Sequence, residues 1–119
     1  MGLPAAFATF AGMIYHLALP EEWEAGMNKG QYAPGPYAEE GFIHCSTEAQ
    51  VLPTANFIFT TQEKLVVLHL VEKRLDDLRW EAGPDGQEFP HVYHKIPVEI
   101  VESLTLLTRD EDGKWVWEK

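Results

Sequence analysis

The chain has 119 residues, which fits a single domain, and 45% of them are hydrophobic, enough to form a core without disulfides. Its 19 acidic residues against 9 basic ones give a net charge of −10, which argues against a nucleic-acid partner. The single cysteine, Cys45, excludes a disulfide scaffold, and no apolar run reaches the roughly 20 residues of a membrane helix. We therefore expect one acidic cytoplasmic domain, with neither nucleic acid nor membrane as a partner.

Residues 1–12 carry no charge and include glycine and proline. They are similar to the apolar part of a signal peptide, but they lack its positively charged start and a convincing cleavage site. We expect residues 1–12 to be a poorly anchored extension, residues 13–119 to be the domain, and Met13 to be a candidate initiator.

The first half of the chain predicts two helices between short strands. Residues 13–17 are apolar and predict the first strand. Pro20 favours the start of a helix and Gly30 its end. Trp23 and Met27 are four residues apart, so both are expected on the face that packs on the sheet.

Prolines and a glycine in residues 31–40 predict a loop, and residues 41–45 predict a second strand. A second helix follows, because Thr47 and Gln50 have the spacing of a capping box. This helix is expected to run to about Phe59.

The second half of the chain predicts strands only. They are expected at residues 64–71, 78–82, 89–96, 103–108 and 114–118. Residues 64–71 are nearly all apolar, which is typical of a central strand. Two helices and about six strands indicate an α+β fold with a mostly antiparallel sheet.

Several polar side chains share sheet faces, because residues two apart in a strand point the same way. The pairs that share a face are His44 with Ser46, Arg79 with Glu81, and His91 with Tyr93. A plain core needs fewer polar groups than this, so these residues are candidates for a site.

Each candidate also has a structural interpretation. A histidine in a strand is commonly a hydrogen-bonded core residue, and this is what we expect of His69. Cys45 is expected to be a buried small hydrophobe rather than a nucleophile. His16, His44, His91 and Glu81 have the ligand chemistry of a zinc site, but their spacing does not match a local zinc motif, so no metal is predicted.

The segments IYHL, GFIHCST, KLVVLHLV, RWE and FPHVYH, in this order, resemble the domain of unknown function 952 family over about residues 13–117. The resemblance implies an ADP-ribosyltransferase-like fold, in which a split sheet grips NAD. It implies that His16 holds the first-strand position of the site. His44 and Ser46 compete for the second-strand position, and Glu81 is the candidate for a late glutamate, with His91 and Tyr93 as rivals.

The implied function is ADP-ribose transfer from NAD, with NAD as substrate and no other cofactor. His16, His44 and Glu81 would then be catalytic, and Ser46, Arg79, His91 and Tyr93 would bind the ligand. Arg79 would contact the pyrophosphate, because NAD is an anion and the protein is acidic.

A second class of function stays open, a non-catalytic module that binds a small ligand or a protein on the same scaffold. Trp115 and Trp117 share one face of the last strand and would suit self-association. We prefer the interpretation that they cover the sheet edge. The sequence leaves the oligomeric state open, with a monomer favoured.

Overall fold

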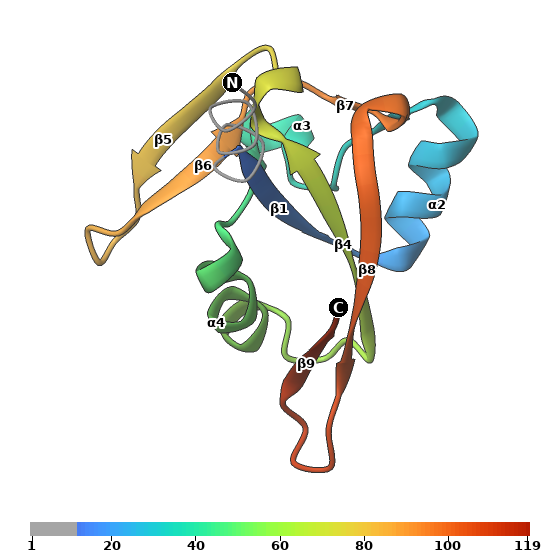
Figure 1. Cartoon of the computed structure of the whole chain (residues 1–119), viewed down its shortest axis with the longest axis vertical. Helices are drawn as coiled ribbons and strands as arrows, with labels where there is room; N and C mark the ends of the chain where they lie inside the picture. Colours follow the sequence, from blue (N-terminus) through green and yellow to red (C-terminus); the bar gives the residue numbers. More distant parts are fainter. Residues whose placement is uncertain (1–11) are drawn as a thin grey trace, which may run out of the picture.

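The structure, a computed structural model, describes residues 12–119 (Figure 1). The extension expected at residues 1–12 thus lies outside the described residues, apart from Gly12. Three α-helices and nine strands occur in the described part, and all of the strand pairings there are antiparallel. The predicted α+β class is confirmed, with one helix and several short strands more than expected. Within residues 12–119 the helices are too short and polar to cross a membrane.

The largest sheet has four strands in the order β1-β4-β8-β9. They are β1 (Met13–Ala18), β4 (Lys64–Val71), β8 (Val101–Arg109) and β9 (Trp115–Glu118). The prediction of a strand at residues 64–71 is confirmed to the residue, and β4 lies inside the sheet. Helix α2 (Pro20–Lys29) covers one face and helix α4 (Glu48–Ile58) the other, which explains why β4 is apolar on both faces (Figure 1).

Helix α2 has the predicted bounds, but its buried face differs from the prediction. Pro20 is its first residue, and Gly30 ends it in the left-handed conformation with φ 83°. Trp23 is buried, whereas Met27 is 48% exposed. The helix instead places Gly26 against the core, since the chain turns back along it as β2 (Gln31–Tyr32).

Residues 31–40 were predicted to form a loop, and this prediction is wrong at both ends of the segment. Its first two residues form β2, which pairs with β7 (Ile96–Pro97) in a two-stranded sheet. Its last four residues form the short helix α3 (Tyr37–Glu40), which Gly41 ends with φ 80°. The prolines between them confine irregular backbone to the middle of the segment.

A third sheet has the order β3-β6-β5. Its strands are β3 (Ile43–His44), β6 (Glu88–Val92) and β5 (Leu78–Ala82). The strand predicted at residues 78–82 is confirmed, whereas the one predicted at 89–96 is divided between β6 and β7. Past β3 the chain reaches the free edge of β1, where the backbones of Ser46 and Tyr15 exchange hydrogen bonds of 2.7 and 2.9 Å. This bridge joins the third sheet to the first.

The capping box of α4 is confirmed, and it reaches beyond the helix. Gln50 Oε1 accepts a hydrogen bond of 3.0 Å from the Thr47 backbone N–H. The Nε2 group of Gln50 donates to the Glu88 carbonyl oxygen and to Gln87 Oε1, both at 2.8 Å. One buried side chain thus ties α4 to the β5–β6 hairpin.

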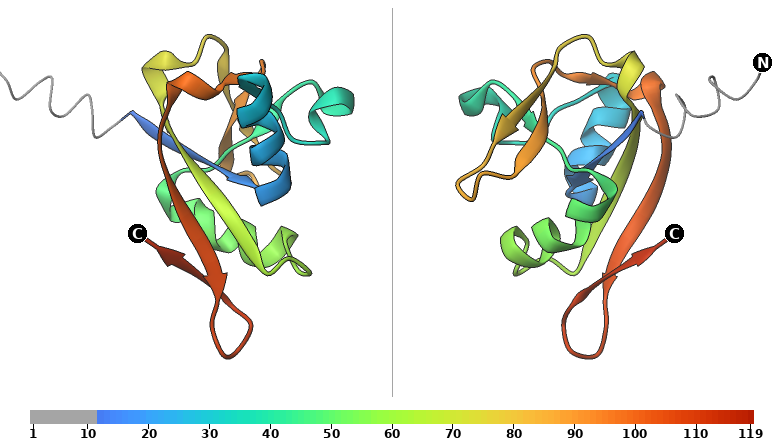
Figure 2. Two further views of the ribbon diagram at one scale, coloured as in Figure 1. Left: turned by 90° about the vertical axis from the view of Figure 1, so that its right-hand side faces the viewer. Right: turned by 60° about the vertical axis from the view of Figure 1, so that its left-hand side comes forward.

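The predicted C-terminal hairpin is confirmed as β8 and β9, and it projects from one end of the molecule (Figure 2). Trp115 is buried with Val51 and Ala55 of α4. Trp117 packs partly against the same cluster. The two tryptophans therefore pack on the face of the sheet that α4 covers.

We expect Gly26→Ala to lower the free energy of unfolding by about 1–2 kcal/mol, although alanine favours helices. A Cβ atom at this position would lie 2.9 Å from Tyr32 Cβ, so the helix and β2 would have to separate. Urea denaturation measures the change. Met27→Ala, at the exposed neighbouring position, is the control and should stay within about 0.5 kcal/mol of wild type. Equal stability of the Gly26→Ala variant and wild type would contradict the close approach.

Candidate functional site

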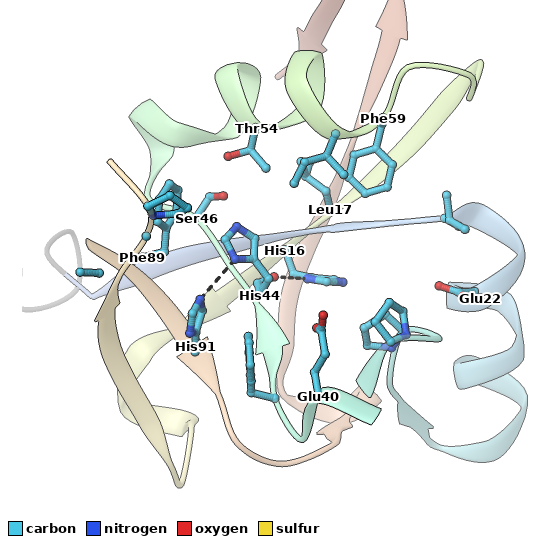
Figure 3. A pocket seen from close by; sticks show the side chains of 18 residues that line it. His16, Leu17, Glu22, Glu40, His44, Ser46, Thr54, Phe59, Phe89 and His91 are labelled. Atoms are coloured by element: carbon cyan, nitrogen blue, oxygen red, sulfur yellow. Dashed lines mark hydrogen bonds between the residues drawn. The ribbon is translucent and has the colours of Figure 1, made fainter. Parts of the chain in front are cut away.

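A pocket of about 630 Å³ opens between α4, the β5–β6 hairpin and the segment around α3 (Figure 3). This volume is typical of small-molecule sites, which span about 300–1,000 Å³. Most of its walls are apolar. The side chains in its lining that carry polar or ionisable groups are His16, Glu22, Glu40, His44, Ser46, Thr54 and His91.

The structure brings most of the predicted site residues to this pocket. His16, His44, Ser46 and His91 line it, and the prediction that His44 and Ser46 share a face holds. The intervening Cys45 packs in the core, where burial raises the pKa of its thiol. This thiol is therefore not an activated nucleophile.

His16 is held on both ring nitrogens by protein groups. Its Nδ1–H donates to the carbonyl oxygen of His44 at 2.7 Å, because a carbonyl can only accept. Its Nε2 then accepts from the Tyr32 hydroxyl at 2.7 Å. His16 is 5% exposed, and burial lowers its pKa to about 4, so the ring is neutral at pH 7. His16 thus joins β1, β2 and β3 beneath the pocket.

Glu81, His91 and His44 form a chain of hydrogen bonds that ends at the pocket, and Figure 3 shows the link between His91 and His44. His91 Nδ1–H donates to Glu81 Oε1 at 2.6 Å, and in the neutral form of His91 its Nε2 then accepts from His44 Nδ1–H, at 3.3 Å. This order leaves the Nε2 lone pair of His44 without a partner among residues 12–119. Burial, and secondarily the nearby His91, lowers the pKa of His44 to about 4.

Tyr93 supports the carboxylate end of this chain. Its hydroxyl donates to the same Glu81 oxygen at 2.6 Å. The hydrogen bonds from Tyr93 and then His91 lower the pKa of Glu81, and the bond to Glu81 raises the pKa of Tyr93. Glu81 therefore stays ionised and holds His91 in one tautomer.

Arg79 is not in the pocket lining. Its guanidinium lies 4.1 Å from the centroid of the Tyr93 ring and forms an ion pair of 3.0 Å with Asp77. Arg79 thus contacts the outer side of the Tyr93–Glu81 pair, where it is engaged by an acidic partner.

Two aromatic residues of the site were not singled out from the sequence. Phe42 stacks on His91 with ring centroids 4.3 Å apart, and Phe89 lies 5.0 Å from His44. Strand alternation could have found Phe42, which is two residues before His44 on the same face. These rings make one side of the pocket aromatic.

Two buried hydroxyl groups also face the pocket. Ser46 is 2% exposed and Thr54 is 9% exposed, and neither hydroxyl has a hydrogen-bond partner within the described part of the chain. Thr54 was missed because a threonine inside a helix carries no distinct signal. Glu22 and Glu40 were missed because they resemble ordinary solvated helix residues.

The four residues with zinc-ligand chemistry do not form a metal site. Across residues 12–119 the structure contains no cluster of three or more histidine, cysteine, aspartate or glutamate side chains placed to hold a metal ion. Both nitrogens of His16 are already engaged by Tyr32 and by the His44 carbonyl.

Comparison with protein-family models gives a match to "Protein of unknown function (DUF952)" over residues 17–104. The chain belongs to this family. It is similar to the crystal structure of protein CC0527 from Caulobacter crescentus, with 34% identity, a TM-score of 0.80, and coverage of 87% of this chain and 93% of that one. The solution NMR structure of CC0527 gives 35% identity and a TM-score of 0.75, covering 86% and 90% of the two chains.

A comparison with curated proteins gave no match. The descriptions of the CC0527 structures state no activity. The comparisons therefore support the family and the α+β fold of this DUF952 protein, but not ADP-ribosyltransferase activity or NAD binding.

We expect the free energy of unfolding to fall as the pH is lowered from 7 toward 4, and to fall less steeply in a His16→Asn variant. An unfolded histidine has a pKa of about 6.5, whereas that of folded His16 is about 4. Between these values the unfolded chain binds the extra proton, so stability rises with pH, by up to about 1.4 kcal/mol per pH unit for this residue. Urea denaturation at several pH values measures the slope.

The ring protons of His16 provide a second test that does not depend on the variant. If their NMR resonances titrate near pH 6.5 in the folded protein, the neutral buried state of His16 is wrong.

We expect Tyr93→Phe to raise the pKa of the Glu81 carboxyl group toward its ordinary value. The phenol hydrogen bond is the largest cause that lowers this pKa, and its loss favours the protonated acid. Carboxyl ¹³C NMR across a pH titration measures the change. Glu48, whose pKa is lowered by Lys119, is the internal control and should not move. An unchanged Glu81 titration would show that Tyr93 does not support the carboxylate.

Proposed function

We propose that the pocket binds a nucleoside-containing small molecule, with NAD as the first candidate, and that His44 moves a proton at the bound ligand. The observation that carries this proposal is the Glu81–His91–His44 chain, whose last nitrogen has no partner among residues 12–119 and belongs to a pocket-lining residue. A carboxylate that orients an imidazole is a recurring arrangement in acid–base catalysis.

The chain suits His44 to act as a general base. His44 is neutral at pH 7, so its Nε2 can accept the proton of an attacking hydroxyl or amine. The resulting imidazolium keeps its Nδ1–H directed at His91, which Glu81 holds from behind. The negative charge of Glu81 then stabilises the positive charge that develops on the chain.

For transfer of ADP-ribose from NAD, the bonds that form and break are defined. The bond between the nicotinamide nitrogen and ribose C1′ breaks, and its electron pair leaves with neutral nicotinamide. The acceptor oxygen or nitrogen bonds to C1′, and its proton goes to His44 Nε2. The buried hydroxyls of Ser46 and Thr54 are suited to hydrogen bonds with the ribose, and Phe42 and Phe89 offer aromatic surface to the ring.

A second candidate function is ligand binding without catalysis. Two observations favour it: protein groups occupy both nitrogens of His16, and Arg79 pairs with Asp77 instead of lining the pocket. In this case the chain serves to orient His44 as a hydrogen-bond acceptor for a ligand.

The test is to titrate NAD into the purified protein by calorimetry and to measure nicotinamide release, comparing His44→Gln with wild type. We expect wild type to bind NAD and to release nicotinamide, and His44→Gln to reduce the release rate by about 10²–10⁴-fold. His94→Gln makes the same substitution outside the pocket lining and should behave as wild type.

Each result of this test separates the candidates. Binding without release of nicotinamide, in wild type and variant alike, would favour the binding module. Release that is equally fast in wild type and His44→Gln would exclude His44 as the base. Absence of NAD binding at millimolar concentration would reject NAD as the ligand.

A further inference from the structure

The ionisable side chains in the pocket lining have an uneven charge. Two of them are carboxylates, Glu22 and Glu40, and no lysine or arginine of residues 12–119 lines the pocket. Figure 3 shows both carboxylates directed toward the interior of the pocket. His16 and His44 add no positive charge at pH 7, because both rings are neutral there.

The two carboxylates come from different elements that meet at the pocket. Glu22 lies in the first turn of α2, and its Oε2 accepts a hydrogen bond of 3.1 Å from the backbone N–H of Gly35. Glu40 is the last residue of α3. The backbone N–H of Gly35 therefore holds Glu22 in the pocket lining, which Glu40 also joins. No third metal-ligating side chain joins them in residues 12–119, which argues for an organic rather than a metal cation.

Two hydroxyl groups in the pocket lining are a second feature that suits a ligand. The side chains of Ser46 and Thr54 are more than nine-tenths buried, face the pocket and have no partner among the described residues. Neither hydroxyl oxygen is among the fully enclosed side-chain atoms of residues 12–119 that lack a partner, so each is open to the pocket and can hydrogen-bond to a ligand there. A ligand with hydroxyl groups would satisfy both of them, together with Nε2 of His44.

The aromatic residues favour the same kind of ligand. Phe42 and Phe89 lie against His91 and His44 and present ring surface to the pocket. Aromatic faces attract cations through their quadrupole, and this attraction strengthens where water is excluded. Glu22 is half-buried and Glu40 is exposed, and their negative charges oppose an incoming phosphate, because like charges repel.

We propose that the part of the ligand that enters the pocket is a positively charged heteroaromatic ring that carries hydroxyl groups, and that phosphate groups stay outside. This inference rests on the proposed function and narrows its substrate class to a cationic nucleoside or the cationic nucleoside end of a larger molecule. Glu22 and Glu40 would select the charge, and Ser46, Thr54 and His44 would bind the hydroxyl groups.

Three probes test whether the affinity of the pocket depends on the charge of the ligand or on its shape. Nicotinamide riboside is a cation, its dihydro form is neutral with nearly the same shape, and nicotinamide mononucleotide adds a phosphate. Calorimetric titration of each into the full chain gives three dissociation constants. The variant Glu40→Gln removes one carboxylate. Glu39→Gln is the matched control, since Glu39 is the neighbouring residue of α3 and does not line the pocket.

We expect nicotinamide riboside to bind at least about tenfold more tightly than either other probe, a difference in free energy of about 1.4 kcal/mol. Glu40→Gln should weaken the binding of nicotinamide riboside about tenfold and leave the affinity for the neutral dihydro form unchanged. The difference in affinity between the riboside and the mononucleotide should become smaller. Glu39→Gln should match wild type.

Three results would overturn the inference. Equal affinity for the cation and its dihydro form, with both lost in His44→Gln, would reject charge selection but leave the proposed function standing. Tighter binding of the mononucleotide than of the riboside would show that a phosphate is accepted. If none of the probes binds at millimolar concentration, both the inference and the proposed nucleoside site are wrong.

Discussion

A single imidazole joins the three sheets of this protein. His16 belongs to the four-stranded sheet, its Nε2 accepts from Tyr32 of the two-stranded sheet, and its Nδ1 donates to the His44 carbonyl of the three-stranded sheet. These contacts are far apart in sequence and buried, so they hold only when all three sheets are in place. This side chain therefore helps to fix the backbone of His44, together with the pairing of β3 with β6 and the Ser46–Tyr15 bridge.

The same burial that makes His16 structural also determines the electrostatics of the pocket above it. An imidazole without water around it stays neutral, so the floor of the pocket offers hydrogen bonds but no positive charge. The acidic groups lie elsewhere, with Glu81 behind His91 and Glu40 on α3. The pocket lining thus combines neutral imidazoles, which can accept protons, with the negatively charged Glu40.

The sequence predicted those parts of the fold that local patterns control. The apolar run of β4 and the alternation of β5 gave their bounds to the residue, because five or more residues reveal a period. Two-residue strands such as β2 carry no period, so β2 was missed together with the role of Tyr32. Alternation placed His91 and Tyr93 on one face, but their shared bond to Glu81 depends on the register between β5 and β6.

The side chain of Gln50 has a mechanical consequence for the pocket. It caps α4 and also bonds the β5–β6 hairpin, so two walls of the pocket are fastened together. Pulling them apart would break the two hydrogen bonds from Gln50 to Gln87 and Glu88, at a cost of roughly 1–3 kcal/mol. These two walls therefore do not separate easily, and the width of the pocket between α4 and the β5–β6 hairpin is fixed by this side chain.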